Sequence, residues 1–291
     1  MAQERGAMAD LHTHTTASDG TLTPRQLAAL AGELGLGAVA ITDHDSVAGL
    51  EEGLAAGEEL GVRVIPGVEL SASQEGCEVH IVGLFIRRDC PELLEFLTRR
   101  REERARRNAR MLERLAEAGM PLDPEEVTPA GSGLLTRIHV AEALARKGWA
   151  ATPVEAMEKY LLPGGPGWVA KNSPCPRECG EIIHRAGGLA YLAHLDRIDK
   201  RDPERGLRMA RRVLETAGLD GLEARYATYT RAWEALADGL AAELGLRRSG
   251  GSDFHGDRKP NRLGTGLGEL FVPAAWALCP DKSVPPRGTD F

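Results

Sequence analysis

The sequence is short of cysteine, of long apolar runs and of basic residues relative to acidic ones. Its five cysteines are an odd number spread along the chain, so we expect no disulfide framework and a reducing environment. No apolar run approaches the roughly 20 residues that a membrane-spanning helix needs. The polar stretch 1–8 also lacks the apolar region of a signal peptide. We therefore expect a cytoplasmic protein with no membrane partner.

The charge balance is acidic, with 36 lysines and arginines against 43 aspartates and glutamates and a formal net charge of −7. This balance argues against a stable nucleic-acid complex, because general nucleic-acid binding requires a basic surface. It does not exclude a small phosphorylated substrate, since bound metal ions change the local sign of the charge.

Apolar runs with strand character alternate with helical patterns along much of the chain. Strands are predicted at 38–41 and 62–65, and Thr23-Pro24 predicts a helix start with an N-cap followed by proline. The alternation resumes at Pro176 and continues to about residue 271. Strands that alternate with helices indicate parallel pairing with the helices outside. With 42% hydrophobic residues among 291, the chain can bury a large core.

The pattern changes between residues 88 and 172. Residues 91–119 predict one long helix with an arginine-rich face, which we interpret as solvated, although it could also gather anionic substrates. Shorter helices are predicted at 136–147 and 153–160. We interpret this block as a helical insertion. Residues 273–291 contain four prolines and are expected to form an irregular tail.

His12 and His14 lie one residue apart on an extended segment, so their side chains project from the same side and can hold one metal ion. A His-x-His pair alone is a weak indication. Further histidines and carboxylates recur where strand-like runs stop or start. Groups at the ends of successive parallel strands converge on one rim, where metal-dependent enzymes hold their chemistry. The recurring groups are Asp19, His44, Glu69, His80, His194, Asp253 and His255.

Six motifs make this interpretation more specific: DLHTHTTASDG, ITDHD, PGVEL, EVHIVGLF, YLAHLD and GGSDFHG. In this order they resemble the PHP (polymerase and histidinol phosphatase) family of metal-dependent phosphoesterases, over about residues 8–87 and 173–272. The resemblance implies an α/β fold, a distorted seven-stranded (β/α) barrel of the PHP type. The helical insertion at 88–172 is then expected over the active site at the barrel mouth.

The resemblance also implies a centre of three divalent metal ions. Its nine ligands fall into three sets, with Glu69 as a bridge: His12, His14, Glu69 and Asp253; Glu69, His80 and His194; and Asp19, His44 and His255. About three protein ligands per ion would leave open coordination positions, which are typical of catalytic sites. Mixed histidine and carboxylate ligands suit manganese, zinc or iron better than magnesium or calcium.

The charge of such a centre indicates what it binds. Three divalent ions against Asp19, Glu69 and Asp253 leave a net charge of roughly +3, which a bridging hydroxide and a phosphate would balance. Divalent metals lower the pKa of bound water towards ~7 and so supply a metal-bound hydroxide as nucleophile. We expect a metal-dependent phosphoric ester hydrolase that acts on small phosphorylated nucleotides or related metabolites.

Two activities of similar family members fit this expectation. One removes the 3′-phosphate from nucleoside 3′,5′-bisphosphates. The other opens five-membered cyclic phosphodiesters and hydrolyses the resulting monoester to free phosphate. A 5′-3′ exoribonuclease acting on short RNA is an alternative, and a non-catalytic, metal-stabilised interaction module is an alternative of another class. All nine ligands are present, which favours an active enzyme.

The insertion carries candidate substrate contacts. Arg137-Ile138-His139 resembles the R-x-H of the nucleotide-phosphatase branch of the family, which usually has proline between the two. Arg137 would clamp a phosphate through its planar guanidinium, and His139 would protonate a leaving oxygen. Lys171 lies where that branch often has a basic residue. We predict that all three bind substrate and that Arg137 and His139 are catalytic.

Replacing Arg137 with alanine tests this prediction. Arg137→Ala should raise KM for a phosphorylated substrate and leave the bound metal unchanged, because the guanidinium would touch phosphate and no metal. Loss of one charge-assisted contact should cost about 1.5–3 kcal/mol, which is about tenfold or more in kcat/KM. Steady-state kinetics with elemental analysis measure both quantities. An unchanged kcat/KM would move the substrate away from Arg137.

Overall fold

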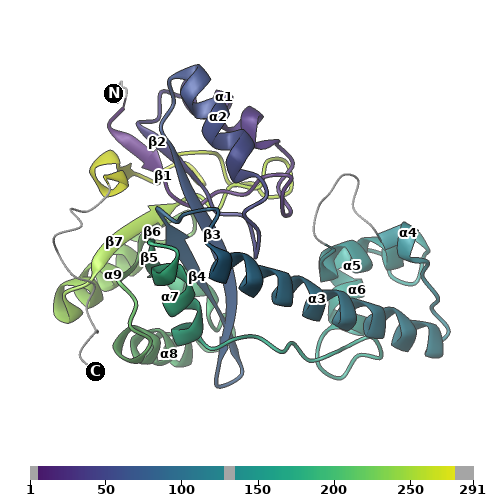
Figure 1. Cartoon of the computed structure of the whole chain (residues 1–291). Coiled ribbons are helices and arrows are strands. Elements are labelled where there is room, and N and C mark those ends of the chain that lie inside the picture. Colours follow the sequence, from purple (N-terminus) through teal and green to yellow (C-terminus); the bar gives the residue numbers. More distant parts are fainter. Residues whose placement is uncertain (1–5, 128–134, 279–291) are drawn as a thin grey trace. The chain divides into compact units, whose positions relative to one another are not determined.

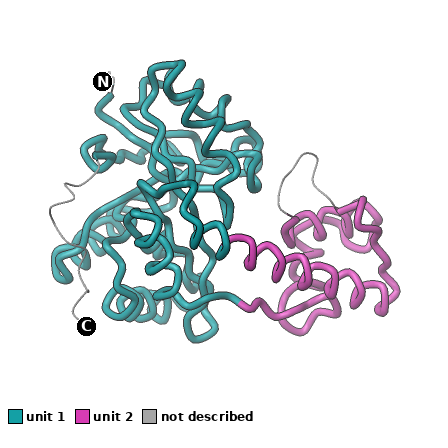
Figure 2. Tube along the Cα trace, viewed as in Figure 1, with its two compact units in different colours: residues 1–96, 173–291 teal, residues 97–172 magenta. Residues whose placement is uncertain are grey.

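The computed structural model describes residues 6–127 and 135–278 (Figure 1). The chain divides into two compact units, unit 1 with residues 1–96 and 173–291 and unit 2 with residues 97–172 (Figure 2). Within the described ranges, no helix has both the length and the apolar character that crossing a membrane requires.

Unit 1 is built on a mixed sheet of eight strands with the order β7-β6-β5-β4-β3-β2-β1-β8. The sheet pairs β1, β2 and β3 in parallel, and likewise β5, β6 and β7, whereas β4 is antiparallel to both of its neighbours. The strands are β1 (Met8–Asp10), β2 (Ala38–Ile41), β3 (Val64–Gln74), β4 (Cys77–Leu84), β5 (Leu189–Leu192), β6 (Gly221–Tyr226), β7 (Arg247–Gly251) and β8 (Val272–Pro273).

The strand count differs from the predicted seven. The additional strand, β8, pairs antiparallel with β1 through Met8↔Pro273 and Ala9↔Val272. Residues 274–277 follow as a short 3-10 helix, η3 (Ala274–Ala277). The prediction of an irregular tail from residue 273 is therefore wrong at its start, because this segment covers the outer edge of β1. Residues 279–291 lie outside the described part of the chain.

Backbone hydrogen bonds join β7, at one end of the strand order, to the segment that follows β1 near the other end. Leu11 N donates to Gly250 O over 3.1 Å, and Asp253 N donates to His12 O over 2.9 Å. The segment after β1 therefore lies beside β7 and the residues that follow it, and the sheet forms a nearly closed barrel. Ala9 of β1, Ile65 of β3 and Val82 of β4 belong to one buried apolar cluster of the core.

Helices cover the outside of the sheet in unit 1 (Figure 1). The first begins as its sequence predicts, because Thr23 is the N-cap, Pro24 is the first helical residue, and Thr23 forms a capping box with Gln26. Gly61 ends the second with a left-handed φ of 68°. The helices are α1 (Pro24–Glu33), α2 (Leu50–Leu60), α7 (Pro176–Arg185), α8 (Pro203–Thr216) and α9 (Arg231–Leu244), with the short 3-10 helix η2 (Leu195–Arg197).

Unit 2 is helical and has its own apolar core, which includes Met111, Leu115, Val140 and Leu144. Arginines of α3 lie on its exposed face, and Arg110 Nη1 lies 2.9 Å from Glu113 Oε2. The elements are α3 (Pro91–Glu117), which begins in unit 1, α4 (Pro124–Val127), α5 (Arg137–Arg146), α6 (Pro153–Ala156) and the π-helix η1 (Met157–Leu161). The predicted position of the insertion over the barrel mouth stays a prediction.

Candidate metal centre

The nine predicted ligands come together at one rim of the barrel in unit 1. His12 and His14 follow β1, His44 follows β2, and His194 follows β5, so these four lie beyond the carboxyl ends of parallel strands. The β3–β4 hairpin extends past the same rim. It carries Glu69 and His80 within the strands, while Asp253 and His255 follow β7 and Asp19 lies in the loop before α1.

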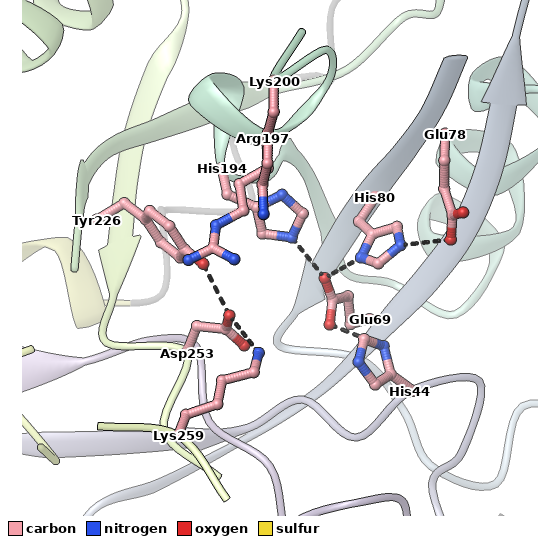
Figure 3. A pocket seen from close by; sticks show the side chains of 10 residues that line it. All are labelled: His44, Glu69, Glu78, His80, His194, Arg197, Lys200, Tyr226, Asp253 and Lys259. Carbon is pink, nitrogen blue, oxygen red and sulfur yellow. Dashed lines mark hydrogen bonds and ion pairs between the residues drawn. The ribbon is translucent and has the colours of Figure 1, made fainter. Parts of the chain in front are cut away.

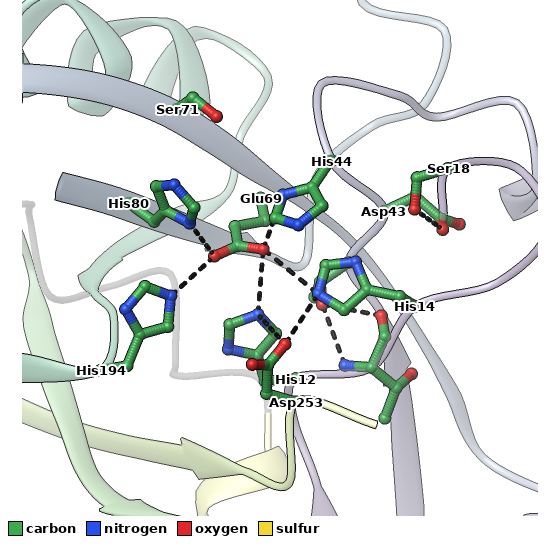
Figure 4. A network of polar contacts seen from close by, with 12 residues as sticks. His12, His14, Ser18, Asp43, His44, Glu69, Ser71, His80, His194 and Asp253 are labelled. Carbon is green, nitrogen blue, oxygen red and sulfur yellow. Dashed lines mark hydrogen bonds and ion pairs between the residues drawn. The ribbon is translucent and has the colours of Figure 1, made fainter. Parts of the chain in front are cut away.

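Glu69 lies at the centre of the cluster (Figure 4). Its Oε1 lies 2.6 Å from His80 Nδ1 and 3.0 Å from His194 Nε2. Its Oε2 faces three other imidazole nitrogens at 2.9–3.2 Å, which belong to His12, His14 and His44. The carboxylate is buried, so its two oxygens face two different sets of imidazoles.

Several ligand atoms are buried without a hydrogen bond. Among the described residues these include His12 Nε2, both ring nitrogens of His14, His44 Nδ1 and Glu69 Oε2. Buried polar atoms normally have a partner, so atoms that face one another in this way fit a site for cations. Three groups have ligand atoms within 4.8 Å of one another: His12, His14 and Asp253; His44, Glu69 and His80; and His14, Asp19, His44 and His255.

These groups resemble the predicted sets without matching them residue by residue. His44 accompanies Glu69 and His80 in the second group, where the sequence prediction has His194. His194 still lies close, with its ring centroid 5.0 Å from that of His80. The assignment of individual ligands to individual ions stays a prediction.

The charges of the cluster depend on one another. Burial alone would raise the pKa of Glu69, but the imidazoles of His44, His12 and His80 outweigh it and hold that pKa well below its usual value. Burial would lower the pKa of His80, but the Glu69 carboxylate outweighs it and raises that pKa to about 10. Protons and metal ions compete for such nitrogens, so binding of metal would release protons.

Glu223, on β6, positions two of the histidines and was missed in the sequence. The carboxylate is fully buried, and its Oε1 lies 2.7 Å from His12 Nδ1. Its Oε2 accepts a hydrogen bond of 2.7 Å from the His194 backbone N–H. A carboxylate behind a histidine fixes the ring orientation and leaves the other nitrogen to face a metal. The available signal was an acidic residue between Leu222 and Ala224, within the range where strands and helices alternate.

Asp253 is held by two further residues that the sequence prediction missed. Its Oδ2 accepts hydrogen bonds of 2.7 Å each from the Tyr226 hydroxyl and from Lys259 Nζ. Its Oδ1 lies 3.3 Å from His14 Nε2. One oxygen is therefore fixed from outside while the other faces the cluster.

Buried hydrogen bonds also hold the loop that carries Asp19. Asp43 accepts bonds of 2.7 Å from the Thr15 backbone N–H and of 2.6 Å from the Ser18 hydroxyl. Asp10 accepts a bond of 2.9 Å from the Ser252 N–H, which joins the end of β1 to the segment after β7. These bonds fix the loops around the centre.

A cavity of about 250 Å³ opens beside the cluster (Figure 3). One wall contains His44, His80 and Glu78, whose Oε1 lies 3.2 Å from His80 Nε2. The other walls contain Tyr226 and positively charged side chains. The positively charged lining residues are Arg197, Lys200 and Lys259.

Comparisons with known proteins assign the chain to a family. The family model described as PHP domain matches residues 10–122. A 5′-3′ exoribonuclease of Haemophilus influenzae is 33% identical over 249 residues, which are 84% of this chain and 89% of the relative. The chain belongs to the PHP family.

Other PHP proteins are similarly close. The phosphoribosyl 1,2-cyclic phosphate 1,2-diphosphodiesterase of Eggerthella lenta is 33% identical over 85% of this chain and 94% of its own length. The 3′,5′-nucleoside bisphosphate phosphatase of Chromobacterium violaceum is 33% identical over 84% and 86%. A solved structure from Bifidobacterium adolescentis, titled a metal-dependent phosphoesterase, has a TM-score of 0.78 at 31% identity and covers 92% of this chain and 93% of its own. The predicted class, a metal-dependent phosphoesterase with a PHP fold, is confirmed.

The three substrate contacts predicted from the PHP resemblance lie in unit 2. Arg137 is the first residue of α5, and Lys171 follows η1 in a segment without regular structure. His139 is buried, and its Nδ1 accepts a hydrogen bond of 3.1 Å from the Thr136 backbone N–H at the start of α5. His139 therefore contributes to the helix cap, and its predicted catalytic role, like the roles of Arg137 and Lys171, stays a prediction.

Replacing Glu223 with glutamine tests its positioning role. Glu223→Gln keeps the shape of the side chain but removes the carboxylate behind His12, so metal affinity should fall about 10–100-fold. Competition with a chelator, followed by elemental analysis, measures this change.

Asp220→Asn is the matched control for this variant. Asp220 Oδ2 lies 2.7 Å from His184 Nε2, a similar carboxylate–histidine pair outside the nine predicted ligands. This variant should keep its metal affinity. Equal losses in both variants, or no loss in Glu223→Gln, would contradict a specific role for Glu223.

Proposed function

We propose that the protein removes the 3′-phosphate from nucleoside 3′,5′-bisphosphates. The observation that carries this proposal is the small cavity beside the candidate metal centre. Its volume of about 250 Å³ and its lining of imidazoles, carboxylates and cations suit a phosphate group together with part of a nucleoside. The Chromobacterium relative, which carries this activity in its name, supports the same substrate class.

A second candidate is the hydrolysis of five-membered cyclic phosphodiesters to a monoester and then to free phosphate. The Eggerthella relative supports it at the same identity of 33%. Exoribonuclease action on short RNA is the third activity that a relative supports. All three reactions need a centre that activates water and stabilises charge on a phosphate, and they differ in what the phosphate is attached to.

We propose that the centre binds three divalent ions, which are manganese, zinc or iron. The buried ligand atoms without hydrogen bonds support this occupancy. The central position of Glu69, with its two oxygens facing different imidazoles, supports a bridging role. The proposed ligands are His12, His14, Asp19, His44, Glu69, His80, His194, Asp253 and His255.

When bound, such ions supply activated water and neutralise charge that develops on the phosphate and on the leaving oxygen. The protein's own residues prepare the site for this chemistry. Glu223 keeps the His12 ring in one orientation. Tyr226 and Lys259 hold Asp253 so that its Oδ1 faces the cluster. A prearranged set of ligands needs little reorganisation during the reaction.

Metal content tests the proposed centre. The purified protein should carry about two to three manganese, zinc or iron ions per chain, because each of three ions has about three ligands. Glu69→Gln removes a negative charge that two of the proposed metal sites share, so this variant should lose more metal than His255→Ala. His255 is a ligand in one proposed site only. Glu243→Gln, in an exposed ion pair with Arg211, should lose none. One ion or fewer in the wild type would rule out a trinuclear centre.

Turnover on a substrate panel tests the proposed reaction. The panel contains adenosine 3′,5′-bisphosphate, a 2′,3′-cyclic nucleotide, a short RNA with a 5′-phosphate and a plain monoester. We expect the highest kcat/KM on the bisphosphate, with adenosine 5′-monophosphate and free phosphate as products. His12→Ala should abolish phosphate release. Preferred turnover of the cyclic nucleotide or of RNA would assign one of the other two activities.

A further inference from the structure

Two positively charged side chains follow His194 at intervals of three residues. Arg197 is the last residue of the 3-10 helix η2, and Lys200 lies three residues further on. Both cations lie on the segment that follows β5, and both line the cavity that His194 also lines. Figure 3 shows both side chains reaching into this space from the same segment.

No ion pair joins Arg197 or Lys200 to a carboxylate within the part of the chain that the structure describes. The Arg197 guanidinium lies 5.5 Å from the centre of the Tyr226 ring, which orients it without neutralising it. Partial burial and the neighbouring Arg197 lower the pKa of Lys200, and the Asp196 carboxylate opposes this shift without reversing it. The two cations therefore lie close enough to repel each other.

Lys259 differs from these two residues. It lines the same cavity, but its Nζ already donates to Asp253 Oδ2 over 2.7 Å. This ion pair neutralises one carboxylate of the proposed centre. Arg197 and Lys200, by contrast, line the cavity without an ion pair to any of the described residues.

The occupied centre would not balance them either. Three divalent ions against Asp19, Glu69 and Asp253 leave roughly +3, which a bridging hydroxide and one reacting phosphate of about −2 would balance without any negative charge to spare. Arg197 and Lys200 add two further positive charges on the same cavity, where Glu78 is the one acidic residue among the described lining residues outside the proposed ligands. A second phosphate group on the substrate would supply the missing negative charge, whereas an uncharged nucleoside end would leave it unbalanced.

We propose that Arg197 and Lys200 form a subsite for a second, non-reacting phosphate of the substrate. This proposal rests on the proposed function. The subsite would determine substrate specificity, because it would favour bisphosphates over monophosphates. Guanidinium and ammonium groups bind phosphate oxygens through charge-assisted hydrogen bonds. In adenosine 3′,5′-bisphosphate, the 3′-phosphate would lie at the metal centre and the 5′-phosphate at this subsite.

A comparison of two substrates tests the subsite. Wild type and Arg197→Gln/Lys200→Gln are assayed on adenosine 3′,5′-bisphosphate and on adenosine 3′-monophosphate. The ratio of kcat/KM, bisphosphate over monophosphate, should fall at least about tenfold in the double variant, because charge-assisted contacts are lost for one substrate only. An unchanged ratio overturns the proposal. Lys200→Gln alone changes an exposed residue and gives a second test if the double variant is unstable.

Binding measurements test the same subsite without turnover. With metal-loaded protein and inorganic phosphate in the buffer, the wild type should bind adenosine 5′-monophosphate at least about tenfold more tightly than adenosine in calorimetry. The double variant should lose this preference. Arg208→Ala, an exposed charge change on α8, should keep both the preference and the kinetic ratio.

The outcomes separate this proposal from the proposed function. If the wild type hydrolyses neither nucleotide, the proposed function fails, and the calorimetric preference for adenosine 5′-monophosphate alone decides the subsite. If the wild type hydrolyses both and the double variant loses equal activity on each, the proposed function stands and the subsite is overturned.

Discussion

The rest of unit 1 depends on one interaction, the contact of the buried Glu69 carboxylate with the imidazoles that surround it. Both oxygens of Glu69 are enclosed, and several nitrogens that face them have no hydrogen bond. Burial of polar atoms without partners is costly in free energy, so the arrangement is stable only if cations or protons occupy the space between them. The surrounding imidazoles are those of His12, His14, His44, His80 and His194.

Closure of the sheet brings together the segments that carry these ligands. The segment after β1 and the segment after β7 are about 240 residues apart in the chain, yet Gly251 lies so close to His12 that an added Cβ would be 2.4 Å from its backbone nitrogen. Two of the proposed ligands, His194 and Asp253, adopt positive φ angles of 27° and 53°. Such conformations cost roughly 1–2 kcal/mol each in residues other than glycine. Hydrogen bonds from the His194 N–H to the Glu223 carboxylate and from the Asp253 N–H to the His12 carbonyl oxygen compensate for this strain.

The cavity beside the centre has two chemically different walls. Imidazoles and carboxylates on one side are the proposed ligands, and they belong to the motifs that resemble those of the PHP family. Arg197 and Lys200 on the other side lie outside those ligands and form no ion pair with the described residues. Relatives with different named substrates share the family fold, so selectivity among phosphate esters must come from groups around the centre and not from the fold itself.

The sequence by itself determined the alternation of strands and helices, the capping of α1 and the types of ligand at the strand ends, because each depends on neighbouring residues. It did not predict β8, since a strand of two residues has no periodic pattern. Only the tertiary structure decided that Glu223 supports His12, 211 residues away, and that Arg197 faces a cavity. Those relationships exist only after the barrel closes, because burial and charge at each position depend on which distant strands become neighbours.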